Sequence, residues 1–454
     1  MLRFFLFACT LLALWAEEIV TTHSIQHEGD SLSYTATVNA AEVSYIAYTL
    51  PGENRPITFA FNGGPGSSSV WLHLGAFGPR RLITPEEGQS IVAPYRLADN
   101  EETLLDLTDI VFIDPVGTGL SPARGELEEG KPNPYSVRGD IEMVGTFIRD
   151  FLTKTGRWNS PKYIAGESYG AARAAGLAEH LMDQYGIYLN GIIFISAAID
   201  LGTLDFGHDR LLPHLLFLPT FATTAKYHHR HYLQDASIEE VAHNARQFVY
   251  HTYTPALFCQ HCFDLETIYK SVSQMTGLPL DVIVQNRGKV SDSLFCQQLL
   301  TQEGRRVGRF DGRITGYYQG SFDDPSAALV EGIFTGAFHD YLHKELNCHN
   351  SYQIFSYEAI EKWFFPDGWG QTNLLHPLRR ALTANPAMKV FVGCGYFDLA
   401  TPFASVEYCF DHLDVPNIQP QFEYYQGGHM YYLNPTERVK FKQDLTRFYT
   451  ENNG

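Results

Sequence analysis

The chain has 454 residues, of which 44% are hydrophobic and 19% are charged, so it can bury a large core and is neither disordered nor fibrous. This length indicates two or three domains, or one large domain that carries an insertion. The formal net charge is −18 and the sequence has no long basic run, which excludes nucleic acid and anionic membrane surfaces as expected partners.

The first 16 residues have the pattern of a secretory signal peptide. A basic start at 1–3 precedes a hydrophobic stretch at 4–15, and the small Ala16 precedes two glutamates. This stretch is too short to cross a bilayer, and no later stretch approaches the ~18 apolar residues of a membrane-spanning helix. We therefore predict a secreted or periplasmic protein without stable membrane insertion.

The next segments predict strands and then a helix. Residues 31–38 alternate between polar and apolar, and 43–50 continues in the same style, which indicates an antiparallel meander. The runs at 57–61 and 110–113 are short and largely apolar, as is typical of strands covered on both faces. An amphipathic helix is expected around 141–151.

The pentapeptide Gly-Glu-Ser-Tyr-Gly at 166–170 lies between an apolar strand at 163–165 and a helix expected at 171–181. At such a turn the G-x-S-x-G pattern is a nucleophile elbow, which would expose the Ser168 hydroxyl at the edge of a parallel sheet. The pentapeptide alone carries little weight in a chain with 38 glycines. Whether it is a catalytic site depends on whether the chain also supplies a base and a carboxylate for the serine.

The second half of the chain predicts more buried strands, at 192–195, 389–392 and 422–425, and a closing helix at 437–449. Strands that alternate with helices imply an α/β fold with a mostly parallel sheet and helices on both faces. The stretch 203–350 breaks this alternation, because it is rich in aromatic residues and histidine and has helical spacing.

We therefore predict a signal peptide at 1–16, an α/β core at 17–202 and 351–454, and a largely helical cap or insertion at 203–350. The mature chain would contain six cysteines: Cys259, Cys262, Cys296, Cys348, Cys394 and Cys409. Their pairing is open, since six cysteines allow 15 arrangements. For the Cys-x-x-Cys at 259–262 we favour a local disulfide or ordinary thiols over a zinc or redox site, and we predict no metal or cofactor.

Two further residues follow strands in the order that a nucleophilic serine requires. Asp398 comes after the strand at 389–392, and His429 comes after the strand at 422–425. In α/β-hydrolases the triad follows the order Ser, Asp, His, and the carboxyl ends of the strands form one edge of the sheet. The sequence thus predicts Ser168 as nucleophile, His429 as base and Asp398 as the carboxylate that orients it.

An oxyanion hole needs two backbone N–H donors, one of which would come from Tyr169, directly after the nucleophile. The loop Asn-Gly-Gly-Pro-Gly at 62–66 ends the strand at 57–61 and fits the second donor, because its glycines allow backbone to approach a ligand.

These motifs together resemble the serine carboxypeptidase family of exported α/β-hydrolases, and the insertion looks most like the bacterial branch. The resemblance rests on the segments 62–69, 114–121, 166–170, 393–402 and 427–430. It implies oxyanion donors from Gly64 and Tyr169, and a site for the C-terminal carboxylate of a peptide at Asn62, Gly63 and Glu167. Since a carboxylate shares a hydrogen bond with Glu167 only while one of the two is protonated, the resemblance also implies activity that favours acidic pH.

Two positions depart from the family pattern. Ser67 stands where the family usually has cysteine, and Ala76 stands where many members have a second glutamate for the substrate carboxylate. Arg80 or Arg81 is a hypothetical substitute for that glutamate. The expected substrate is a peptide or protein with a free C-terminus. The alternatives are an esterase, an acyltransferase or an aminopeptidase on the same fold, and a binding protein without turnover.

Overall fold

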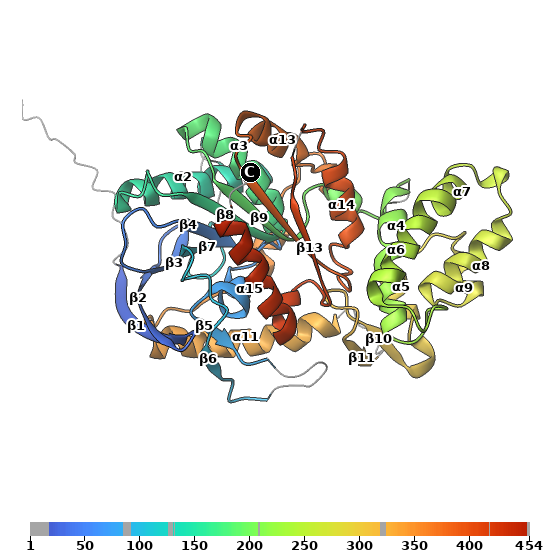
Figure 1. The fold of residues 1–454 in the computed structure, drawn as a ribbon, viewed down its shortest axis with the longest axis horizontal. Coiled ribbons are helices and arrows are strands. Elements are labelled where there is room, and N and C mark those ends of the chain that lie inside the picture. Colours follow the sequence, from blue (N-terminus) through green and yellow to red (C-terminus); the bar gives the residue numbers. More distant parts are fainter. Residues whose placement is uncertain are drawn as a thin grey trace, which may run out of the picture.

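The computed structural model describes residues 18–84, 92–125, 130, 132–207, 209–317, 324–416 and 418–451 (Figure 1). The signal peptide predicted at 1–16 lies outside the described residues. Within the described ranges, no helix combines the length and the apolar character needed to cross a membrane.

One nine-stranded sheet forms the centre of the molecule, in the order β1-β2-β3-β7-β4-β8-β9-β12-β13 (Figure 1). The first three strands and the β3–β7 pair are antiparallel, and every pair from β7 to β13 is parallel. The strands of this sheet are β1 (Ile19–His27), β2 (Asp30–Asn39), β3 (Ser44–Thr49), β4 (Ile57–Phe61), β7 (Asp109–Asp114), β8 (Lys162–Ser168), β9 (Gly191–Ala197), β12 (Lys389–Gly395) and β13 (Gln421–Tyr425).

Helices cover both faces of this sheet because successive side chains of its inner strands point to opposite faces. In β9, Ile192 packs with the helices of one face and Ile193 with those of the other. The first face holds α2 (Val137–Thr155), α3 (Tyr169–Tyr185), α12 (Tyr357–Lys362), α13 (Leu375–Ala384) and α14 (Phe403–Asp411). The second face holds α1 (Val70–Leu72), α11 (Pro325–Lys344) and α15 (Pro435–Thr450).

Local signals fix the ends of the longer helices. Ser136 begins α2, since its hydroxyl accepts a hydrogen bond from the amide of Gly139, and Gly156 ends the helix at φ 68°. Asn434 begins α15 in the same way, with Pro435 in the first turn.

A group of mostly short helices forms a separate lobe beside the sheet, at the right in Figure 1, with its own buried cluster from Phe217 to Val307. Its elements are α4 (Leu212–Leu216), α5 (Leu218–Tyr227), α6 (Ile238–Phe248), α7 (Thr254–Phe258), α8 (Leu265–Thr276), α9 (Leu280–Gln285), α10 (Asp292–Gln298), β10 (Arg305–Val307) and β11 (Thr315–Tyr317). A further small ribbon pairs β5 (Arg80–Leu82) with β6 (Leu97–Asp99).

The α/β-hydrolase fold with a mostly parallel sheet and a helical insertion is confirmed. The strand predicted at 57–61 is β4 to the residue, and the other predicted strands and helices are present within a few residues. Strand β1 was not predicted. It is a sheet edge whose residues are mostly exposed or half-buried, so it lacks the apolar alternation that marked β2.

Candidate active site

Ser168 occupies a strained turn between β8 and α3. Its φ of 61° and ψ of −128° lie in a region that L-residues rarely adopt. The β8–β9 pairing shifts register between Glu167 and Ser168. A Cβ atom on Gly166 would lie 2.2 Å from the carbonyl oxygen of Gly170, so glycine is required for so sharp a passage from strand to helix. This is the strand–turn–helix context expected of a nucleophile elbow.

His429 and Asp398 meet beyond the carboxyl ends of β13 and β12. The Nδ1 atom of His429 lies 2.8 Å from Oδ2 of Asp398. The side chain of Asp398 is fully buried and that of His429 is 4% exposed, so water does not compete for this hydrogen bond. Because Nδ1 faces the carboxylate, Nε2 is the ring nitrogen left to exchange a proton with another group.

Three hydrogen bonds besides that of His429 hold the Asp398 carboxylate. The amides of Ala400 and Thr401 donate to Oδ1 over 2.8 and 2.9 Å, and the Thr401 hydroxyl lies 2.7 Å from Oδ2. The same hydroxyl also lies 2.9 Å from the carbonyl oxygen of Ser196. Sequence reasoning did not single out Thr401. The Asp-x-x-Thr spacing in a turn was the available signal, since aspartate in turns accepts bonds from amides that follow it.

The charges around His429 favour its protonated form. Burial lowers the pKa of His429, but the charge and hydrogen bond of Asp398, and more weakly the charge of Glu167, outweigh this effect and raise the pKa overall. Arg309 acts in the opposite direction as the weakest of these influences. An imidazolium formed during a reaction is therefore stabilised in this site.

The loop after β4 lies directly against the elbow. A Cβ atom on Gly63 would approach the amide nitrogens of Tyr169 and Gly170 to 2.5 and 2.6 Å, so only glycine allows this contact. Residues 62–64 line the same cavity as Ser168. The structure thus brings together the two segments from which the oxyanion donors were predicted.

A buried arginine on α3 is hydrogen-bonded to the loop that follows β4. The Arg173 side chain, on α3, is 1% exposed; its Nη1 donates to the carbonyl oxygen of Asn62 over 2.7 Å, and its Nε donates to Asp140 over 2.8 Å. The helix that follows Ser168 thereby fixes the position of the loop. Sequence reasoning missed Arg173, because an arginine within a run of alanines gives no sign that it is buried.

We expect Arg173→Met to lower the free energy of unfolding by about 3–5 kcal/mol, because it leaves the buried Asp140 carboxylate without its partner. Urea unfolding followed by circular dichroism measures this loss. Arg138→Ala is the matched control on α2: its guanidinium is 90% exposed and pairs with Glu142, so the midpoint should hardly change. Equal effects of the two changes would contradict a structural role for Arg173.

Glu167 is buried beside Ser168, and its pKa is raised toward neutrality. Burial raises its pKa to about 7, although the charge of His429 and the hydrogen bond from Tyr432 lower it. The Tyr432 hydroxyl donates to Oε2 over 2.6 Å. Tyr432 is a further contact that the sequence did not reveal. Around pH 7 the Glu167 carboxyl can therefore either donate or accept a hydrogen bond.

One cavity of about 330 Å³ joins these groups. The predicted site residues that line it are Asn62, Gly63, Gly64, Glu167, Ser168, Tyr169 and His429. Asp398 does not line it and is reached through His429. A larger cavity of about 430 Å³ shares part of the wall, at Phe310, Val330 and Met430. Because neither Ser168 nor His429 lines the larger cavity, we place the site in the smaller one.

The position of the family's second glutamate, Ala76, and its two hypothetical substitutes, Arg80 and Arg81, lie outside the Ser168 cavity. Ala76 is buried in a helical turn and does not line the Ser168 cavity. Arg80 is paired with Asp99 and with Glu345, and neither Arg80 nor Arg81 lines that cavity. The hypothesis that one of these arginines holds the substrate carboxylate is therefore not supported.

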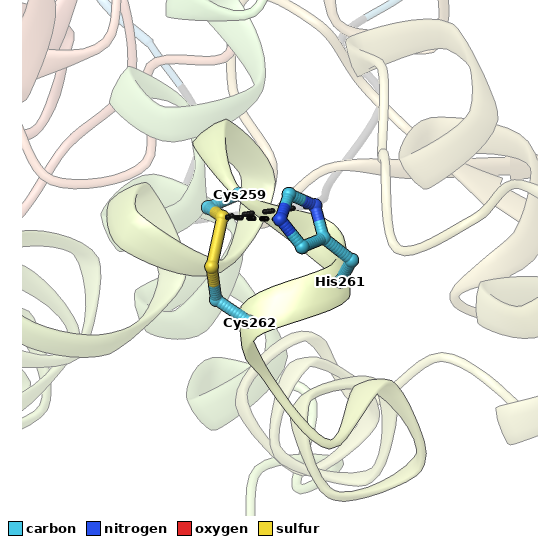
Figure 2. A group of neighbouring side chains, drawn as sticks. All are labelled: Cys259, His261 and Cys262. Atoms are coloured by element: carbon cyan, nitrogen blue, oxygen red, sulfur yellow. Dashed lines mark hydrogen bonds between the residues drawn. A yellow bond between two sulfur atoms is a disulfide. The ribbon is translucent and has the colours of Figure 1, made fainter.

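The Cys-x-x-Cys segment forms a local disulfide between Cys259 and Cys262, as favoured above, with the His261 ring close to the Cys259 sulfur (Figure 2). It lies in the helical lobe, outside the Ser168 cavity. Among the described residues, the free cysteines are buried, and they are Cys296, Cys348, Cys394 and Cys409.

A strained serine after one strand and a His–Asp pair after two later strands, at one edge of a parallel sheet, are the features of an α/β-hydrolase. A comparison with known families identifies the family within this fold. The chain belongs to the serine carboxypeptidase family, whose sequence model matches residues 40–303, more than half of its length.

Curated relatives match over shorter stretches. The chain is 27% identical to serine carboxypeptidase-like 36 of Arabidopsis thaliana over 175 residues, which are 37% of this chain and 34% of that protein. It is 29% identical to a carboxypeptidase Y homolog of Arthroderma benhamiae over 157 residues, which are 33% and 28% of the two chains. It is 35% identical to the pheromone-processing carboxypeptidase KEX1 of Saccharomyces cerevisiae over 100 residues, which are 22% of this chain and 12% of that protein. The chain thus spans about a third or less of the length of these relatives.

The fold is similar to a solved structure over nearly its whole length. The crystal structure of a prohormone-processing carboxypeptidase from Saccharomyces cerevisiae aligns with 96% of this chain and 93% of its own, at a TM-score of 0.56 and 15% identity. At this identity the similarity concerns the fold.

Proposed function

We propose that this chain is a serine carboxypeptidase, which removes residues from the C-terminus of peptides by way of an acyl-enzyme. Family membership supports the activity class. The observation that carries the mechanism is the single cavity that Ser168, His429 and residues 62–64 share, with Asp398 bonded to His429.

In this mechanism His429 Nε2 takes the proton of Ser168 while the serine Oγ attacks the last peptide carbonyl. The N–H groups of Gly64 and Tyr169 stabilise the oxyanion, a contribution worth about 10²–10³ in rate per donor. The C–N bond then breaks, and His429 returns the proton to the departing amine. Water, deprotonated by the same imidazole, cleaves the acyl-enzyme and restores Ser168. Asp398 keeps the proton of the neutral ring on Nδ1.

Substrate recognition would use the buried Glu167 with Asn62 and Gly63. A protonated Glu167 can donate a hydrogen bond to the C-terminal carboxylate of the substrate, whereas an ionised Glu167 repels it. Since the pKa of Glu167 is raised to about 7, this contact is present in acid and lost as pH rises through neutrality.

The pH profile should therefore depend on the C-terminus of the substrate. For a free-acid peptide we expect kcat/KM to fall below the pKa of His429, where the base is protonated, and above about pH 7, where Glu167 ionises. For a C-terminal ester the alkaline fall should be absent. Glu167→Gln should remove the alkaline fall and move the acidic limb to lower pH, because the charge of Glu167 raises the pKa of His429. Identical profiles for acid and ester would contradict this role.

The direct test is digestion of a peptide and of its C-terminally amidated twin, with the products read by mass spectrometry. A carboxypeptidase shortens the free peptide one residue at a time and leaves the amidated twin largely intact. Equal cleavage of both, internal cleavage, or release of N-terminal residues would reject the proposal.

A serine esterase on the same fold is the second candidate, because Ala76 stands where many members of the family have a second glutamate for the substrate carboxylate. A panel of p-nitrophenyl esters beside blocked dipeptides separates the two. Turnover of esters without release of C-terminal residues would favour the esterase.

We also propose export through the predicted signal at 1–16 and membership of the bacterial-type branch. The basic start and apolar run support export. The insertion supports the branch, although the relatives reported above are from a plant and from fungi. If the chain is exported, N-terminal sequencing of the exported protein should find a sequence that begins near Glu17.

A further inference from the structure

The helical lobe contributes a loop to the wall of the Ser168 cavity. This loop, residues 308–314, joins β10 to β11 and is hydrogen-bonded to the segments that carry Asp398 and His429. The amide of Leu399 donates to the carbonyl oxygen of Arg309 over 3.0 Å, and the amide of His429 donates to that of Phe310 over 2.6 Å. The rings of Phe310 and His429 lie 5.2 Å apart. The backbone at Arg309 is thus fixed against the catalytic residues.

Among the described residues that line the cavity, Arg309 is the one arginine or lysine. Its Nε is 3.1 Å from an Asp292 carboxylate oxygen, and within the described ranges its two terminal nitrogens make no hydrogen bond or ion pair. The side chain is 46% exposed, so it can turn toward a ligand. Its charge already acts on His429, whose pKa it lowers.

A peptide that is cleaved at its last bond brings its C-terminal carboxylate within one residue, about 3.8 Å between Cα atoms, of the reacting carbonyl. That carboxylate must therefore enter the Ser168 cavity. Glu167 can bind it only when protonated, and Glu331, on α11, is the other charged group in the wall besides His429 and Arg309. A planar guanidinium with two unused nitrogens can donate two parallel hydrogen bonds to a carboxylate, and this contact does not depend on the protonation of Glu167.

We propose that Arg309 binds the C-terminal carboxylate of the peptide substrate in the Ser168 cavity. The proposal rests on the carboxypeptidase function proposed above and adds the residue that recognises the free C-terminus. It makes recognition less dependent on protonation of Glu167, so that binding of the free C-terminus weakens above pH 7 but is not abolished.

The test measures binding without turnover. In the Ser168→Ala background, calorimetry gives the Kd of a free-acid peptide and of its C-terminal amide. We expect Arg309→Ala to raise the Kd of the free-acid peptide about tenfold to a hundredfold, as for loss of one charge-assisted contact. The Kd of the amide should change by no more than about twofold. Arg309→Lys should recover part of the loss, because an ammonium keeps the charge without the two-pronged geometry. The loss in Arg309→Ala should grow from pH 5 to pH 8, as Glu167 ionises.

Arg230→Ala is the matched control: this arginine also belongs to the helical lobe, is 39% exposed and pairs with Glu303, outside the cavity. In the enzyme with Ser168 intact, Arg309→Ala should also move the acidic limb of kcat to higher pH, since Arg309 lowers the pKa of His429. An equal loss for acid and amide, or no loss for either, would overturn the role of Arg309 while the native enzyme still trims peptides. If the native enzyme releases no C-terminal residues at all, the proposed function and this inference both fail.

Discussion

Ser168→Ala is expected to lower kcat for peptide cleavage about 10⁶-fold, the scale seen when a serine nucleophile of a triad is removed. Without the hydroxyl no acyl-enzyme forms, and His429 has no proton to take. The remaining rate, about 10³–10⁴ above the uncatalysed reaction, would come from the oxyanion donors and from substrate binding. Single-turnover kinetics with a free-acid peptide measures the loss.

The fold should survive this change. The Ser168 hydroxyl makes no hydrogen bond to another described residue, so its removal costs no structural contact. The small alanine side chain keeps the same strained turn, with φ near 61°. A fluorophosphonate should label the native protein once per chain and fail to label the variant. A double change with His429→Ala should be no slower than Ser168→Ala alone, because the two residues act as one unit. Retained turnover in the single variant would reject Ser168 as nucleophile.

The sequence predicted those parts of the fold that one segment determines by itself. β4, β7 and β9 are covered on both faces and therefore consist largely of apolar residues. The turn at Ser168 was recognisable because its glycines are needed for a close contact within the turn itself, between Gly166 and Gly170. The positions of Asp398 and His429 followed from their place after strands, since parallel strands end at one edge.

The remaining contacts join segments that are far apart in the chain. Tyr432 meets Glu167 across 265 positions, and Arg173 meets the carbonyl of Asn62 across 111. The loop at 308–314 reaches the segments that carry Asp398 and His429 only because the helical lobe contacts the edge of the sheet. No local periodicity encodes such meetings, so the residues that support the site had to be read from the structure.

Asp398→Asn is expected to lower kcat about 10⁴-fold while binding of substrate changes little. The hydrogen bonds around Asp398 determine how the side-chain amide of an asparagine at this position would be oriented. Oδ1 accepts from the amides of Ala400 and Thr401, so the oxygen of an asparagine would take that position. Its NH₂ group would then face Nδ1 of His429, which is 2.8 Å from Oδ2 in the native site.

That orientation reverses the tautomer of the ring. Facing an N–H donor, Nδ1 must carry the lone pair, so the proton of the neutral imidazole moves to Nε2, which can then no longer take the proton of Ser168. The loss should shrink at high pH, where hydroxide can serve as base. Thr401→Val is the matched control, because it removes one hydrogen bond to Oδ2 and leaves the carboxylate and the tautomer in place; we expect a loss of about tenfold or less, in line with one hydrogen bond. Similar losses in the two variants would show that Asp398 acts only as a structural support, and the nitrogen-15 shifts of the His429 ring would decide the tautomer directly.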